Sequence, residues 1–220
     1  MKDSLIIFNR SIYDTYQHLG SVIKYTILWW LCLLPVFTLG PATAGLFYVL
    51  RMKKKEMRVT TKDYFIGFRI YFKVGIQITL LYLFVMVPGI VYIHYLFSFS
   101  ILLTNIIAVL IIYVLILFNL VIFFMFPLMV EQNLNKISVI LKRAFRLVSE
   151  NFSFTLNVAL YLLLMTLISS VITIMMVAWA GMVALLSYNS VLYLLSKYNP
   201  DEYTFDSNVK WKGIIKVWNK

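Results

Sequence analysis

Long apolar runs alternate with short basic segments along this chain of 220 residues. The apolar segments cover residues 22–50, 74–94, 101–130, 152–173 and 178–196. A helix rises 1.5 Å per residue, and about 20 apolar residues cross the hydrocarbon core of a bilayer. The pattern therefore predicts an all-α fold, a polytopic membrane helix bundle of five apolar helical segments. We expect one membrane domain over residues 1–200 and a basic cytoplasmic tail over residues 201–220.

Composition supports a membrane protein, and the placement of charge predicts its orientation. Hydrophobic residues make up 62% of the chain and the mean hydropathy is +0.86, whereas soluble domains are about 45–50% apolar. Of the 20 Lys and Arg residues, eight lie in 51–73, four in 136–146, five in 197–220 and three before residue 25. This asymmetry is typical of the positive-inside rule. It predicts a multi-pass cell-membrane protein with a cytoplasmic C-terminus. It also argues that the net charge of +11 does not serve to bind nucleic acid.

Amphipathic segments precede or follow the apolar runs. Apolar residues at helical spacing predict a helix over 137–148, and Thr60 with Asp63 resembles a capping box at the start of another helix. In the tail, two tryptophans and two isoleucines lie on one helical face over 211–218 and lysines lie opposite. This pattern predicts an anchor on anionic lipid, with a disordered basic tail as the alternative.

Residues that carry common chemistry are scarce. The chain has one cysteine, Cys32, and two histidines, His18 and His94, and its carboxylates lie outside the apolar runs. These counts argue against a metal site and against a proton-coupled carrier, which needs an ionisable group at depth. We find no nucleophile motif, zinc motif or phosphate-binding glycine loop in the sequence. We therefore expect no enzymatic activity and no cofactor.

The first apolar segment is interrupted by "PVFTLGP", residues 35–41. Proline lacks a backbone N–H and glycine permits unusual φ, so we expect the helix to break there. Two geometries follow: one broken span, or a re-entrant hairpin that returns to the side from which it came. Irregular backbone within a membrane must be satisfied by protein or by a wet cavity. The candidate residues for contact with a ligand or partner are Thr38, Gly40, Pro41, Thr43 and Asn119; a purely structural bend is the alternative.

The sequence also carries a family resemblance. The stretches "WWLCLLPVFTLGPATAGLFYVLRMKKKE", "DYFIGFRIYFKVG" and "FFMFPLMVEQNLNKISVILKRAFRLVSENFSFTL" resemble the YesL family of bacterial membrane proteins, over about residues 9–197. Members of that family have no assigned biochemical activity and are often encoded beside carbohydrate-uptake ABC transporters. The resemblance implies a bacterial cell membrane and a link to sugar uptake, and it implies no catalytic residues.

Two functions follow as expectations. The first is an accessory protein in the lipid bilayer that partners the permease subunits of an ABC-type carbohydrate-uptake system. The alternative is a small stand-alone permease or channel with its site at the broken first helix. Since the chain has no nucleotide-binding P-loop, any ATP-driven step would belong to a partner.

Overall fold

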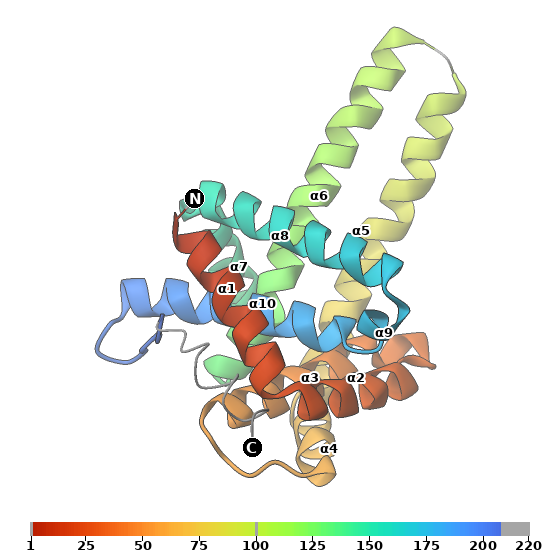
Figure 1. Cartoon of the computed structure of the whole chain (residues 1–220). Coiled ribbons are helices and arrows are strands. Elements are labelled where there is room, and N and C mark those ends of the chain that lie inside the picture. Colours follow the sequence, from red (N-terminus) through yellow and green to blue (C-terminus); the bar gives the residue numbers. More distant parts are fainter. Residues whose placement is uncertain (1, 100, 208–220) are drawn as a thin grey trace.

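The computed structural model describes residues 2–99 and 101–207, and this part of the chain is helical and contains no strand. The predicted all-α fold is therefore confirmed. The predicted anchor over 211–218 lies outside the described residues. The α-helices, labelled in Figure 1, are α1 (Lys2–Gln17), α2 (Leu19–Leu33), α3 (Leu39–Lys54), α4 (Thr61–Ile70), α5 (Phe72–Ser98), α6 (Leu102–Glu131), α7 (Ile137–Glu150), α8 (Phe152–Val171), α9 (Thr173–Met176) and α10 (Trp179–Tyr198). A short 3₁₀ helix, η1 (Val36–Thr38), lies between α2 and α3.

Four of these helices, α5, α6, α8 and α10, are long and apolar enough to cross a membrane. Each occupies one of the apolar segments predicted after residue 73, within a few residues at either end. The prediction of a multi-pass membrane helix bundle is confirmed at this level. Among the four, α10 is the most enclosed, since 67% of its most apolar stretch is buried within the protein.

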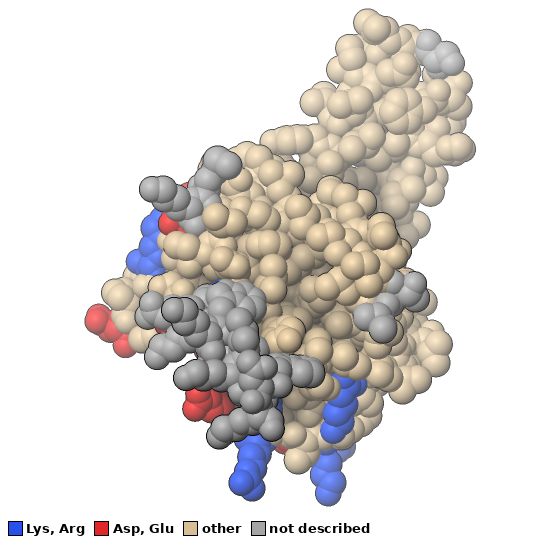
Figure 2. Space-filling model, viewed as in Figure 1, with Lys and Arg blue, Asp and Glu red and all other residues tan. Residues whose placement is uncertain are grey.

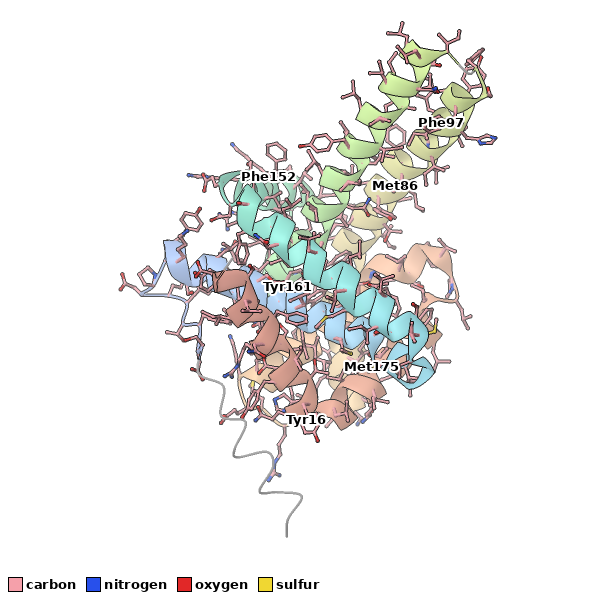
Figure 3. The ribbon with its side chains drawn as sticks, turned by 45° about the horizontal axis from the view of Figure 1, so that its top comes forward. Tyr16, Met86, Phe97, Phe152, Tyr161 and Met175 are labelled. Atoms are coloured by element: carbon pink, nitrogen blue, oxygen red, sulfur yellow. The ribbon has the colours of Figure 1, made fainter. Side chains whose placement is uncertain are left out.

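Helices α5 and α6 form a hairpin that projects from the rest of the molecule (Figures 1 and 3). Its outward side chains are apolar and open, as shown by Phe84, 79% exposed, and Leu102, 78% exposed. Phe97 lies near the tip of this hairpin (Figure 3). The visible face of the projecting part carries no Lys, Arg, Asp or Glu, whereas charged side chains gather over the body (Figure 2). Such a surface suits lipid tails or the apolar helices of another membrane protein.

The broken first segment folds as a hairpin of two short helices, α2 and α3. The indole Nε1 of Trp29 on α2 donates to the hydroxyl of Thr43 on α3 at 3.0 Å, so the two helices lie side by side. Their far ends also meet, because His18 and Lys53 line one cavity. With 15 and 16 residues, neither helix reaches the length that a span needs. The chain thus folds back on itself at the break instead of continuing in one direction.

Helices α1, α4 and α7 cover this framework. Ile7 of α1 is fully buried, and the neighbouring Phe8 stacks on Tyr161 of α8 with ring centroids 4.5 Å apart (Figure 3). Helix α4 starts at the predicted cap, where the backbone N–H of Thr60 donates to the Asp63 carboxylate at 2.6 Å. Helix α7 confirms the predicted helix over 137–148, although Phe145 of the same apolar pattern is 63% exposed.

Candidate functional site

Directly after the break in the first segment, helix α3 packs closely against helix α5. Gly40 lies in the first turn of α3 against Gly75 of α5, and a Cβ on Gly40 would stand 2.0 Å from the Gly75 carbonyl oxygen. The Gly40 N–H donates to the Thr79 hydroxyl at 2.8 Å. The expectation of an unusual φ at Gly40 is wrong, because no described glycine has a positive φ. Glycine is required here because two backbones approach closely.

Pro41 does not break a helix in this structure. The irregular residues are 34–38, and Pro41 lies in the first turn of α3, which begins at Leu39. Backbone N–H groups of a first turn have no intrahelical acceptor, so proline is tolerated there without loss of a hydrogen bond. Pro41 therefore belongs to the first turn of the returning helix, and a substitution to alanine restores no intrahelical bond.

The two threonines beside the break bond to carbonyl oxygens within the chain. The Thr38 hydroxyl lies 2.5 Å from the carbonyl oxygens of both Cys32 and Pro35. Thr43 donates to the Leu39 carbonyl at 2.7 Å while it accepts from Trp29. Backbone groups in hydrocarbon have no water to which they can bond. These contacts therefore provide hydrogen bonds to carbonyl oxygens at the break from within the protein.

The fifth candidate, Asn119, lies apart from the break. Its amide donates to the Leu115 carbonyl at 2.9 Å and to the Met86 sulfur at 3.4 Å, and its oxygen accepts from Tyr82 at 3.4 Å. Figure 3 shows Met86 on the α5–α6 hairpin. The five candidates thus form two groups: four around the α2–α3 turn, and Asn119 inside the α5–α6 hairpin.

A cavity of about 160 Å³ lies beside the break, between α2, α3, α6 and α10. Its walls are aromatic and aliphatic, with Trp29, Phe47, Phe126 and Trp179 among them, and Thr43 is the one side chain in the lining that carries a hydroxyl. The cavity is partly open to its surroundings, and its walls are apolar. It offers a hydrophilic solute few hydrogen-bond partners.

Charge is concentrated elsewhere, at the end of the body where α1, α3 and α10 meet. Asp14 of α1 is 2% exposed and pairs with Arg10 at 3.0 Å and with Lys54 of α3 at 2.9 Å. Lys54 also donates to the amide oxygen of Asn189 on α10, whose amide nitrogen donates back to Asp14 at 3.0 Å. Asn189 donates to Ser11 of α1 as well, at 3.0 Å. We call Arg10, Asp14, Lys54 and Asn189 the charged cluster.

A second ion pair lies one turn away along α3. Glu131, 8% exposed at the end of α6, forms an ion pair with the Nε of Arg51 of α3 at 3.1 Å and accepts a hydrogen bond from the Tyr188 hydroxyl of α10 at 2.6 Å. Arg51 also donates to Asn133 at 3.1 Å, and Asn133 accepts from Tyr71 at 2.9 Å. These pairs hold α3, α6 and α10 together at the same end as the charged cluster.

Burial and the surrounding charges shift the pKa of Lys54 in the charged cluster and of the nearby His18. Burial lowers the pKa of Lys54, and Asp14 opposes that shift by attraction and by its hydrogen bond. Burial also lowers the pKa of His18, with a further decrease from the charges of Lys53, Lys54 and Arg10 that exceed the single opposing charge of Asp14. The space beside His18 is therefore net positive in character.

Two cavities open on this end of the body. One of about 290 Å³ is lined by Arg10, Lys54, His18 and Lys53, among others, and one of about 550 Å³ lies between α1, α3, α10 and the segment 202–206. Arg10 and Lys54 line both cavities. Among the described residues, no group of three or more His, Cys, Asp or Glu side chains could hold a metal ion.

Sequence reasoning did not anticipate this end of the molecule. The segment "RMKKK" is typical of a basic loop, yet Arg51 and Lys54 lie in the last turn of α3 and form buried ion pairs. One signal was present: Arg10 and Asp14 stand four residues apart in an amphipathic helix, the spacing of a helical ion pair. Asn189, within the apolar run 178–196, was a second.

Comparison with known proteins found a similarity over part of this framework. Residues 22–95 match DUF624, described as a protein of unknown function. The matched region runs from α2 through most of α5 and thus contains the α2–α3 hairpin and the Gly40–Gly75 contact. Comparison with curated proteins found no match, and comparison with solved structures found none either.

Proposed function

We propose that this chain is an accessory membrane protein of an ABC-type carbohydrate-uptake system, located in the bacterial cell membrane and without catalytic activity. The observation that carries the proposal is that the polar groups at the break are hydrogen-bonded within the protein. Thr38, Gly40 and Thr43, which the sequence makes candidates for solute contact, form their hydrogen bonds inside the protein. A carrier of sugars needs polar groups turned toward the solute, so these bonds favour a role through contacts with other proteins.

The link to carbohydrate uptake rests on the resemblance to the YesL family, whose members are often encoded beside such transporters. The match of residues 22–95 to DUF624 is compatible with this link and assigns no activity. The lack of a P-loop fits a chain that leaves ATP hydrolysis to a partner.

The α5–α6 hairpin is the surface best suited to a permease partner. Its far part projects beyond the body, and its outward side chains, such as Phe84 and Leu102, are open and apolar. Within a bilayer, helices associate through close packing of such faces. The basic segments face the cytoplasm in this proposal, and the tail over 201–220 contacts anionic lipid there.

The alternative function, a stand-alone permease with its site at the break, makes a different prediction for purified protein. Reconstituted alone into liposomes, an accessory protein moves no labelled sugar above the level of protein-free liposomes. Uptake that depends on the protein would overturn the accessory role. A variant with Thr43→Val would then test the site, because a permease that uses this hydroxyl would lose uptake at normal incorporation.

A further inference from the structure

Helix α4 is amphipathic, and one of its faces packs against α3. Tyr64 is fully buried, and its hydroxyl donates to the Ala42 carbonyl of α3 at 3.0 Å. One turn further along, a Cβ on Gly67 would stand 2.5 Å from the Cβ of Tyr48, so the two helices touch there as well. The side of α4 that carries Tyr64 and Gly67 is therefore fixed against the body.

The opposite face of α4 is apolar and open. Phe65, Ile66 and Ile70 are 49%, 46% and 55% exposed, and their spacing places them on one side of the helix. A contiguous row of open aromatic and aliphatic side chains marks a surface that contacts a membrane or another protein. We call these three residues the apolar row of α4.

Cations without ion pairs flank the apolar row. Lys62 and Arg69 lie on the same face of α4, Lys73 follows in the first turn of α5, and all three are exposed. Among the described residues, none of the three forms an ion pair with a carboxylate. The one carboxylate of α4, Asp63, accepts hydrogen bonds from the Thr60 N–H at 2.6 Å and from its hydroxyl at 2.8 Å. The positive charge of this face is therefore available to an anion outside the protein.

Chain connectivity places this face at a membrane boundary. Helix α5, a candidate span, begins at Phe72 directly after α4, and residues 74–130 contain no Lys, Arg, Asp or Glu. Lys73 is therefore the last charged residue before the chain enters its longest apolar region. Figure 1 shows α4 at the end of the molecule opposite the tip of the α5–α6 hairpin, and Figure 2 shows Lys and Arg side chains at that end.

We propose that α4 binds the membrane surface through this face, with the apolar row among acyl chains and the three cations on the phosphate groups of anionic lipids. A helix with an apolar side and flanking cations lies in the plane of the interface in this way. Each Lys or Arg near such a surface strengthens the attraction to anionic lipid. Lipid is favoured over an acidic protein because headgroup phosphates surround the start of α5. The contact is separate from the one expected of the tail over 201–220.

A probe on α4 tests the proposal with the purified full chain. Ile66→Cys, in a Cys32→Ser background, is labelled with bimane, and the protein is placed in nanodiscs of mixed phosphatidylglycerol and phosphatidylcholine. One lipid at a time carries brominated acyl chains, which quench bimane on contact. Both lipids should quench the probe, and the ratio should show phosphatidylglycerol enriched beside α4 by about three- to ten-fold.

Charge variants separate a site on α4 from a general effect of charge. Lys62→Gln should lower the enrichment about two-fold, because this lysine has no ion pair within the described protein and loses its contact with the headgroup. The matched control is Lys55→Gln, which removes the same charge from an exposed lysine that is already paired with Glu131 at 3.8 Å. It should leave the enrichment nearly unchanged. Equal losses in the two variants would overturn the assignment to α4.

The quenching also decides what covers the apolar row. If neither lipid quenches the probe, the row does not lie in the bilayer and the proposal fails. Equal quenching by the two lipids would place the row in lipid without a preference for anionic headgroups, which contradicts the role of the cations. No transport partner is present in the assay, so the result stands or fails separately from the proposed function.

Discussion

Gly40→Ala should destabilise the protein, because α3 and α5 touch at this residue. The added Cβ would stand 2.0 Å from the Gly75 carbonyl oxygen, while ordinary contact begins at 3.4 Å, so the neighbouring atoms must part by 1.4 Å (3.4 minus 2.0). Overpacking of this kind costs about 1–3 kcal/mol. The hydrogen bond from the Gly40 N–H to Thr79, worth about 1 kcal/mol, weakens as the helices separate.

A gain in helix propensity offsets part of this cost. Alanine is favoured over glycine inside a helix by about 1 kcal/mol, so the net loss should be about 2 kcal/mol, or about thirty-fold in the unfolding equilibrium. Gly20→Ala provides the control, because a Cβ at Gly20 would meet no atom within 4 Å. That variant should be as stable as the unmodified protein or more so.

The assay is unfolding in mixed micelles of increasing denaturing detergent, followed by tryptophan fluorescence. Gly40→Ala should unfold at a lower denaturant fraction than the unmodified protein, and Gly20→Ala should not. If Gly40→Ala unfolds at the same fraction as the unmodified protein, the helix contact is looser than described and the packing account of the break fails.

Three further predictions concern the charged end and the topology. Asp14→Asn leaves Lys54 buried without its counterion and should cost about 3 kcal/mol or more in the same unfolding assay; an unchanged midpoint would show that the pair contributes nothing. Because burial and the neighbouring cations lower the pKa of His18 below 6.5, the unfolded chain binds the proton more tightly, so stability should fall as pH decreases below 6.5. His18→Gln should flatten that part of the pH profile, and an unaltered slope would assign it to other groups. A reporter active only outside the cell, fused after Lys220, should be silent, whereas activity would reverse the predicted orientation.

Run lengths made the membrane framework predictable from the sequence. A helix that crosses a bilayer must be apolar for about 20 residues, so α5, α6, α8 and α10 are visible as continuous runs. The break was predictable because "PVFTLGP" combines two prolines and a glycine. The cap at Thr60 was predictable because its partner Asp63 lies three residues away.

Contacts between distant residues were not predictable in the same way. Asp14 and Lys54 are 40 residues apart, and Asp14 and Asn189 are 175 apart, so no local pattern marks them as partners. The role of Gly40 was misassigned for a related reason. In the sequence, a glycine between prolines indicates conformational freedom, whereas in the structure glycine is needed because Gly75 of another helix lies against it. A basic run next to an apolar segment also has the same sequence pattern whether its lysines meet water or a buried carboxylate.

The central claim, an accessory role beside a carbohydrate permease, is tested most directly by affinity purification from gently solubilised membranes of cells that use the transported sugar. The account predicts that permease subunits of the uptake system co-purify with the protein, and that they are retained with Pro41→Ala, since Pro41 only lies in the first turn of the returning helix. Purification of the protein free of permease subunits, together with sugar uptake by the protein alone in liposomes, would contradict the account.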